Sequence, residues 1–131
     1  MSTILVIDDD DLVRDTLVRM LERAGFQAVS ARNGREGLAQ FHSHPPDLIV
    51  TDIIMPDFDG IETVMAFKRT APAVPIIAVS GGGRTHTMQF LEAAQRLGAD
   101  MILSKPFKQA ELVSAITQLL ARPKNKENTP R

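Results

Sequence analysis

The chain has 131 residues, a formal net charge of -1, 44% hydrophobic residues and no cysteine. This length suits one domain, and the nearly neutral charge gives no general attraction to nucleic acid or to an anionic membrane. The lack of cysteine excludes disulfides and thiol chemistry, and no apolar stretch approaches the length of a membrane span, so we expect a cytoplasmic protein.

The first elements predicted along the chain are two strands and two helices. Ile4–Ile7 is apolar on both faces, as buried parallel strands are. A helix is predicted over Asp11–Ala24, because apolar residues recur on one of its faces and a glycine follows it. Phe26–Ala31 is a more polar strand, expected at an edge of the sheet. Asn33-Gly34 then opens a helix that Pro45-Pro46 stops.

The middle of the chain repeats this alternation. Leu48–Thr51 is a third apolar strand, and residues 55–60 form a loop that contains a proline and a glycine. A helix is expected over Ile61–Thr70, where a proline follows shortly. Ile76–Val79 is the fourth strand, and the glycines at 81–83 indicate a flexible loop.

The last elements complete five rounds of strand and helix. Thr85–Leu97 is predicted to be helical, Met101–Ser104 to be a strand, and Phe107–Leu120 to be a helix. This alternation is typical of a doubly wound α/β domain, with a five-stranded parallel sheet in the order 2-1-3-4-5 and five flanking helices. We expect residues 1–121 to form this domain and residues 122–131, which are polar and charged, to be a disordered tail or a truncated linker.

Polar residues stand where four of the apolar runs end. Asp8 and Asp9 follow the first run, and Asp52 follows the third. Ser80 and Lys105 follow the fourth and fifth. The ends of parallel strands meet at one edge of the sheet, where ligands of open α/β sheets bind. Clustered carboxylates repel one another unless a cation offsets them, and oxygen ligands suit Mg²⁺ or Ca²⁺, with Mg²⁺ leaving room for a phosphate oxygen. The set therefore indicates a divalent metal and a phosphoryl group.

Four segments, taken together and in this order, carry a resemblance to a known family. The segments are Ile4–Asp9, Asp47–Gly60, Val79–Gly81 and Gly98–Phe107. With them the chain resembles the response-regulator receiver domains of two-component signalling, over roughly residues 3–121, and the fold this implies is flavodoxin-like.

The resemblance implies a Mg²⁺ site. Asp8 and Asp9 match the acidic pair that holds the ion, with Asp9 the direct ligand and Asp8 acting largely through water. The phosphoacceptor Asp52 also contacts the metal in the family, and the backbone carbonyl of Ile54 matches the main-chain ligand.

The resemblance also implies the roles of the remaining site residues. Asp52 matches the aspartate that accepts a phosphoryl group from a sensor histidine kinase or a histidine phosphotransfer protein. Ser80 matches the switch hydroxyl, and Lys105 matches the lysine that stabilises the acyl phosphate. The Lys105-Pro106 bond is expected to be cis. A downstream partner would bind the face formed by the predicted elements 85–97, 101–104 and 107–120.

Two departures from the family pattern concern the switch. Ile102 stands where the family often has an aromatic residue, so the usual coupling between hydroxyl and aromatic ring is not expected. Ser80 is followed by three glycines, whose backbone entropy makes the loop costly to order. The small residue at Gly82 also leaves the acceptor open to water, which suggests a short phosphoryl lifetime.

Two other functions are alternatives to a phosphoacceptor switch. An aspartyl-phosphate phosphatase or phosphotransferase usually carries a second acid two residues after its nucleophile, and here that residue is Ile54. A domain that is never phosphorylated and acts only as an adaptor is the other alternative. We expect a signalling switch rather than a conventional enzyme.

Overall fold

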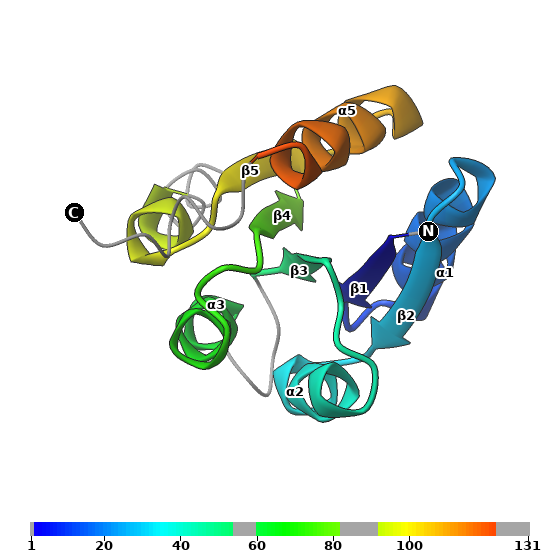
Figure 1. The fold of residues 1–131 in the computed structure, drawn as a ribbon. Coiled ribbons are helices and arrows are strands. Elements are labelled where there is room, and N and C mark those ends of the chain that lie inside the picture. Colours follow the sequence, from blue (N-terminus) through cyan, green and yellow to red (C-terminus); the bar gives the residue numbers. More distant parts are fainter. Residues whose placement is uncertain (1, 54–59, 82–91, 123–131) are drawn as a thin grey trace.

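The fold, in a computed structural model that describes residues 2–53, 60–81 and 92–122, is built on one parallel sheet (Figure 1). Its strand order is β2-β1-β3-β4-β5, as predicted. The strands are β1 (Thr3–Ile7), β2 (Gln27–Ala31), β3 (Leu48–Asp52), β4 (Ile76–Gly81) and β5 (Met101–Lys105). The polar strand β2 lies at an edge, as its composition indicated.

Helices cover both faces of the sheet. They are α1 (Asp11–Arg23), α2 (Gly34–Ser43), α3 (Gly60–Thr70) and α5 (Gln109–Leu120), and residues 92–97 are helical as well. In Figure 1, α1 and α5 lie on one face, and α2 and α3 lie on the other. The beginning of the predicted fourth helix, at 85–91, and the predicted loop at 55–59 fall outside the described residues. Within the described ranges, no helix is long and apolar enough to cross a membrane.

Alternate residues of each strand enter two separate cores. In β1, Leu5 and Ile7 pack on the α2 and α3 side, whereas Ile4 and Val6 pack on the α1 and α5 side. All four side chains are at most 1% exposed. Each such burial stabilises the fold by about 1.5–3 kcal/mol. Because both faces are covered, every strand except the edge strand β2 is mainly an apolar run, with polar residues at or just after its carboxyl end.

The helix ends show why some predicted boundaries shift. Asp10 caps α1, because its carboxylate accepts hydrogen bonds from the backbone N–H groups of Leu12 and Val13. Asp10 is therefore a capping residue of the helix. The last helix begins at Gln109 rather than at 107, because the Glu111 carboxylate accepts a hydrogen bond from the Lys108 backbone N–H at 2.7 Å and so defines the first turn.

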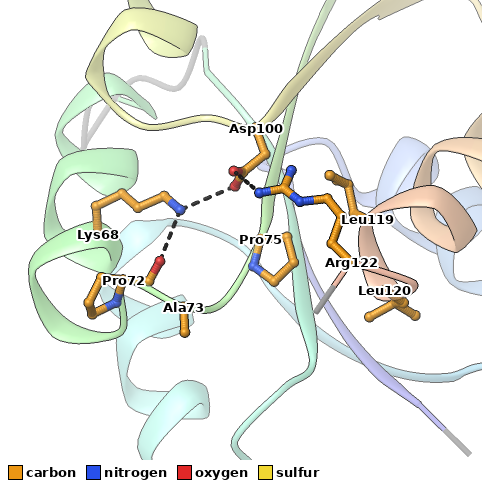
Figure 2. A pocket seen from close by; sticks show the side chains of 8 residues that line it. All are labelled: Lys68, Pro72, Ala73, Pro75, Asp100, Leu119, Leu120 and Arg122. Atoms are coloured by element: carbon orange, nitrogen blue, oxygen red, sulfur yellow. Dashed lines mark hydrogen bonds and ion pairs between the residues drawn. The ribbon is translucent and has the colours of Figure 1, made fainter. Parts of the chain in front are cut away.

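The amino end of the sheet has its own ionic cluster (Figure 2). Asp100, just before β5, lies between Lys68 Nζ at 3.1 Å and Arg122 Nη2 at 3.5 Å. The same carboxylate accepts a hydrogen bond from the backbone N–H of Ile76 at 2.9 Å. These residues line a small cavity of about 50 Å³. One acid with two cations and a backbone donor is well satisfied, so we interpret this end as structural.

Candidate functional site: an acidic pocket at the carboxyl edge

Three carboxylates from two strand ends converge at the carboxyl edge of the sheet. Asp8 and Asp9 follow β1, Asp52 closes β3, and the two strands pair in parallel with Ile7 beside Thr51. One oxygen atom of each of the three acids lies within 4.8 Å of one another. The sequence-based expectation that these acids meet is therefore correct in geometry.

Lys105 brings the positive charge of the pocket from the end of β5. Its Nζ lies 3.0 Å from Asp8 Oδ2 and 3.6 Å from Asp52 Oδ2, and the side chain is 21% exposed. Burial alone would lower the pKa of Lys105, but the charges of Asp52 and Asp8 and the hydrogen bonds to them outweigh burial and raise the pKa above its ordinary value. The amine is therefore a permanent ammonium at neutral pH.

Asp8 and Asp9 occupy different environments. Asp8 is fully buried, and both of its carboxylate oxygens accept hydrogen bonds from the protein: Oδ2 from Lys105 Nζ, and Oδ1 from the backbone N–H of Asp10 at 2.9 Å. Asp9 is exposed, and Asp52 is 7% exposed. A cation entering from solvent would therefore meet Asp9 directly, whereas Asp8 already serves two protein donors.

Ser80 lies at the same edge, on β4, which is the strand next to β3. Its neighbour on β5 is Ser104, and Gly81 pairs with Lys105, so β4 runs two residues further than the predicted 76–79. Ser80 is fully buried, and within the part of the chain that the structure describes its Oγ has no hydrogen-bond partner. Leaving a buried hydroxyl unpaired costs about 1–3 kcal/mol, so the Ser80 hydroxyl is available to a ligand at this edge.

The segment after Asp52 is held by backbone contacts. The Ile53 N–H donates to the Val79 carbonyl at 3.0 Å, which continues the pairing of β3 with β4 beyond Asp52. Gly60, the first residue of α3, lies so close that an added Cβ would stand 2.1 Å from the Ile53 Cα. Ile54, the predicted main-chain ligand, and the glycines at 82 and 83 lie outside the described residues.

The proline expectation is confirmed, and Ile102 has a defined place on the last strand. The Lys105-Pro106 bond is cis. Ile102 lies on β5 opposite Ala78 and packs, partly buried, against the core on the α2 and α3 side.

Sequence reasoning missed one residue at this edge, Arg14 of α1. Its Nη1 donates to the backbone carbonyl of Asp8 at 2.9 Å. A basic residue one turn into the helix after an acidic run was the only signal that the sequence offered.

The donor set of the pocket fits a divalent cation. Three carboxylates offer oxygen ligands alone, and oxygen ligands are the ones that Mg²⁺ prefers. At 4 Å, two such charges repel by about 4 kcal/mol at an effective dielectric of 20. One ammonium facing three carboxylates leaves the pocket with excess negative charge that a cation would offset.

Comparison with known proteins gives the class. A family model of the response regulator receiver domain matches residues 4–117. The chain belongs to that family: it is a receiver domain of two-component signalling whose acidic pocket is formed by Asp8, Asp9 and Asp52.

Individual relatives agree with this assignment. Response regulator MprA of Mycolicibacterium vanbaalenii is 36% identical over 119 residues, which cover 91% of this chain and 50% of that protein. Transcriptional regulatory protein PrrA of Mycobacterium tuberculosis is 38% identical over 119 residues, with the same coverage. The chain thus spans about half the length of the curated relatives it matches. A crystal structure of a putative response regulator from Chloroflexus aurantiacus has a TM-score of 0.85 and 31% identity, and the match covers 92% of this chain and 98% of that one.

Proposed function

We propose that Asp52 is the phosphoacceptor of this receiver domain. An Asp52 carboxylate oxygen attacks the phosphorus of a phosphohistidine on a sensor kinase or a phosphotransfer protein. The P–O bond to Asp52 forms as the P–N bond breaks, and the electron pair of that bond returns to the imidazole. One observation carries the proposal: Asp52 lies 3.6 Å from a lysine ammonium and within 4.8 Å of two further carboxylates, at the ligand-binding edge of the sheet.

The divalent cation of the site is proposed to be Mg²⁺, held by Asp9 and Asp52 together with the carbonyl of Ile54. Asp8 takes part largely through water, which agrees with the use of both its carboxylate oxygens by protein donors. When bound, the ion supplies positive charge that neutralises the phosphoryl oxygens during transfer.

Lys105 and Ser80 are proposed to hold the transferred group. The Lys105 ammonium, already placed beside Asp52, pairs with one phosphoryl oxygen. The buried Ser80 hydroxyl donates to another, which would satisfy a group that has no partner among the described residues. Phosphorylation then shifts a two-state equilibrium at the face formed by β5, α5 and the fourth helix, where a downstream partner binds.

The proposal is tested by phosphorylation with acetyl phosphate and Mg²⁺, followed by intact mass measurement. We expect one phosphoryl group on the wild-type chain and none on Asp52→Ala. Asp15→Ala, which removes an exposed acid from α1, is the matched control and should be modified like the wild type. A wild-type adduct that persists in Asp52→Ala refutes the assignment of the acceptor.

A second measurement separates the switch from an enzyme. With a phosphomonoester in excess, the proposed receiver consumes one phosphoryl group per chain and then only the amount set by its own dephosphorylation. Sustained turnover far above that rate would instead identify a phosphatase or phosphotransferase.

The family match over residues 4–117 supports the assignment of residues 1–121 to the receiver domain.

A further inference from the structure

Arg14 links the first helix to the backbone of the acidic pocket. It lies one turn into α1, and its side chain is only 13% exposed. One guanidinium nitrogen, Nη1, donates to the backbone carbonyl of Asp8 at 2.9 Å, and the other, Nη2, pairs with Asp11 Oδ1 at 2.5 Å. The planar guanidinium therefore connects the end of β1 with the first turn of α1, across the segment that carries Asp9.

The bond to the Asp8 carbonyl completes the fixation of that residue. The backbone N–H of Asp8 donates to the Ala31 carbonyl at 3.1 Å, and its carboxylate accepts from Lys105 and from the backbone N–H of Asp10. Without Arg14, the Asp8 carbonyl would lose its side-chain donor at the point where the chain leaves the sheet and turns into α1. Asp9 follows directly, and its side chain is exposed.

We propose that Arg14 is a positioning residue of the divalent-cation site, which holds the β1–α1 connection so that Asp9 and Asp8 face Asp52. The inference rests on the proposed function, because it presumes that the pocket binds Mg²⁺. Arg14 acts through the Asp8 backbone and does not itself contact the cation.

Two effects of Arg14 on cation binding have opposite signs, and this makes the inference testable. As a nearby positive charge, Arg14 repels a cation, so its removal by charge alone would tighten Mg²⁺ binding. As a positioning group, it orders the ligands, and residues that orient metal ligands typically change metal affinity by about 10–100-fold when lost. The proposal requires the second effect to exceed the first.

The experiment measures Mg²⁺ affinity by calorimetry on the unphosphorylated protein, which needs no activity. We expect Arg14→Ala to bind Mg²⁺ about tenfold more weakly than the wild type. Arg19→Ala removes the same charge from an exposed position of the same helix, and it should stay within about twofold of the wild type, since exposed charges interact weakly with distant ones. Wild-type or tighter affinity in Arg14→Ala overturns the proposal.

A second variant and a spectroscopic readout separate positioning from loss of fold. Arg14→Lys keeps the charge but lacks the planar fork, so weaker binding is again expected, and wild-type affinity in this variant overturns the proposal. In the amide spectra of metal-free protein, the Asp9 and Asp10 resonances should shift in both variants while those of β3 and β4 stay in place. If the wild type itself does not bind Mg²⁺ at millimolar concentration, the proposed function fails. If the wild type binds Mg²⁺ and both Arg14 variants bind it equally, only the role of Arg14 fails.

Discussion

Replacement of Asp52 by asparagine should stabilise the metal-free protein. The Asp52 carboxylate lies within 4.8 Å of oxygens of Asp8 and Asp9, and 3.6 Å from the Lys105 ammonium. At an effective dielectric of 20, each acid repels Asp52 by about 3.5 kcal/mol, and Lys105 attracts it by about 4.6 kcal/mol. The net repulsion is about 2.4 kcal/mol. Solvent screens the exposed Asp9, so we expect Asp52→Asn to raise the free energy of unfolding by about 1–2 kcal/mol.

The assay is urea unfolding with EDTA present, at neutral pH and low salt. Asp15→Asn, which makes the same change at an exposed position of α1, should alter the unfolding free energy by less than about 0.5 kcal/mol. Added Mg²⁺ should narrow the difference between wild type and Asp52→Asn, because the wild type binds the ion more tightly. A variant that is equally stable or less stable than the wild type in EDTA would refute the reasoning, since it would mean that the three acids do not repel one another in the native state.

Three further predictions concern the lysine, a glycine and a helix cap. Lys105→Met should lower the free energy of unfolding by about 3 kcal/mol, because it leaves the buried Asp8 without its cation. Because the pKa of Lys105 is raised in the folded protein, the stability that Lys105 contributes is complete below a pH of about 10.4. This stability is lost as the pH rises through the folded pKa of Lys105. Denaturant melts of the wild type and Lys105→Met, from neutral to alkaline pH, should therefore converge only above the folded pKa. Gly60→Ala should destabilise the fold by about 3 kcal/mol or more, because the added Cβ would meet the Ile53 backbone. Gly25→Ala should cost only about 1–2 kcal/mol, because nothing lies within 4 Å of its added Cβ and only the positive φ is unfavourable. Equal losses of stability in urea melts of the two variants would contradict this. Asp10→Ala should cost about 1 kcal/mol of stability, and Asp10→Asn much less, because asparagine also caps helices. The Mg²⁺ affinity of Asp10→Asn should lie within about twofold of the wild type. A loss of Mg²⁺ binding in Asp10→Asn would instead identify this residue as a metal ligand.

The sheet and its acidic edge could be predicted from the sequence because they depend on patterns that repeat along the chain. Four of the five strands are short apolar runs followed by a polar residue, and parallel connections bring those polar residues to one edge. Asp8 and Asp52 are 44 positions apart in the sequence, yet both follow such runs, so their meeting needed only the topology.

The details that could not be predicted depend on single side-chain contacts. The start of the last helix depends on which residue the Glu111 carboxylate reaches, and the position of Arg14 depends on the rotamer of a long side chain. The close approach of Gly60 to the Ile53 backbone is a tertiary contact, whereas the sequence indicated only a loop ending there. None of these contacts leaves a periodic signal in the sequence.

The two ends of the sheet differ in how their charges are balanced, and this difference points to the carboxyl edge without reference to any relative. At the amino end, Asp100 faces both Lys68 and Arg122, so its charge is compensated, and the cavity beside it is small. At the carboxyl edge, three carboxylates share one ammonium, and a buried hydroxyl has no partner among the described residues. Acids that repel one another and an unsatisfied hydroxyl both cost stability. Both costs lie at the carboxyl edge, where a bound cation and an oxygen-rich anion would relieve them. Relief of these costs on ligand binding is what the proposed phosphorylation switch requires.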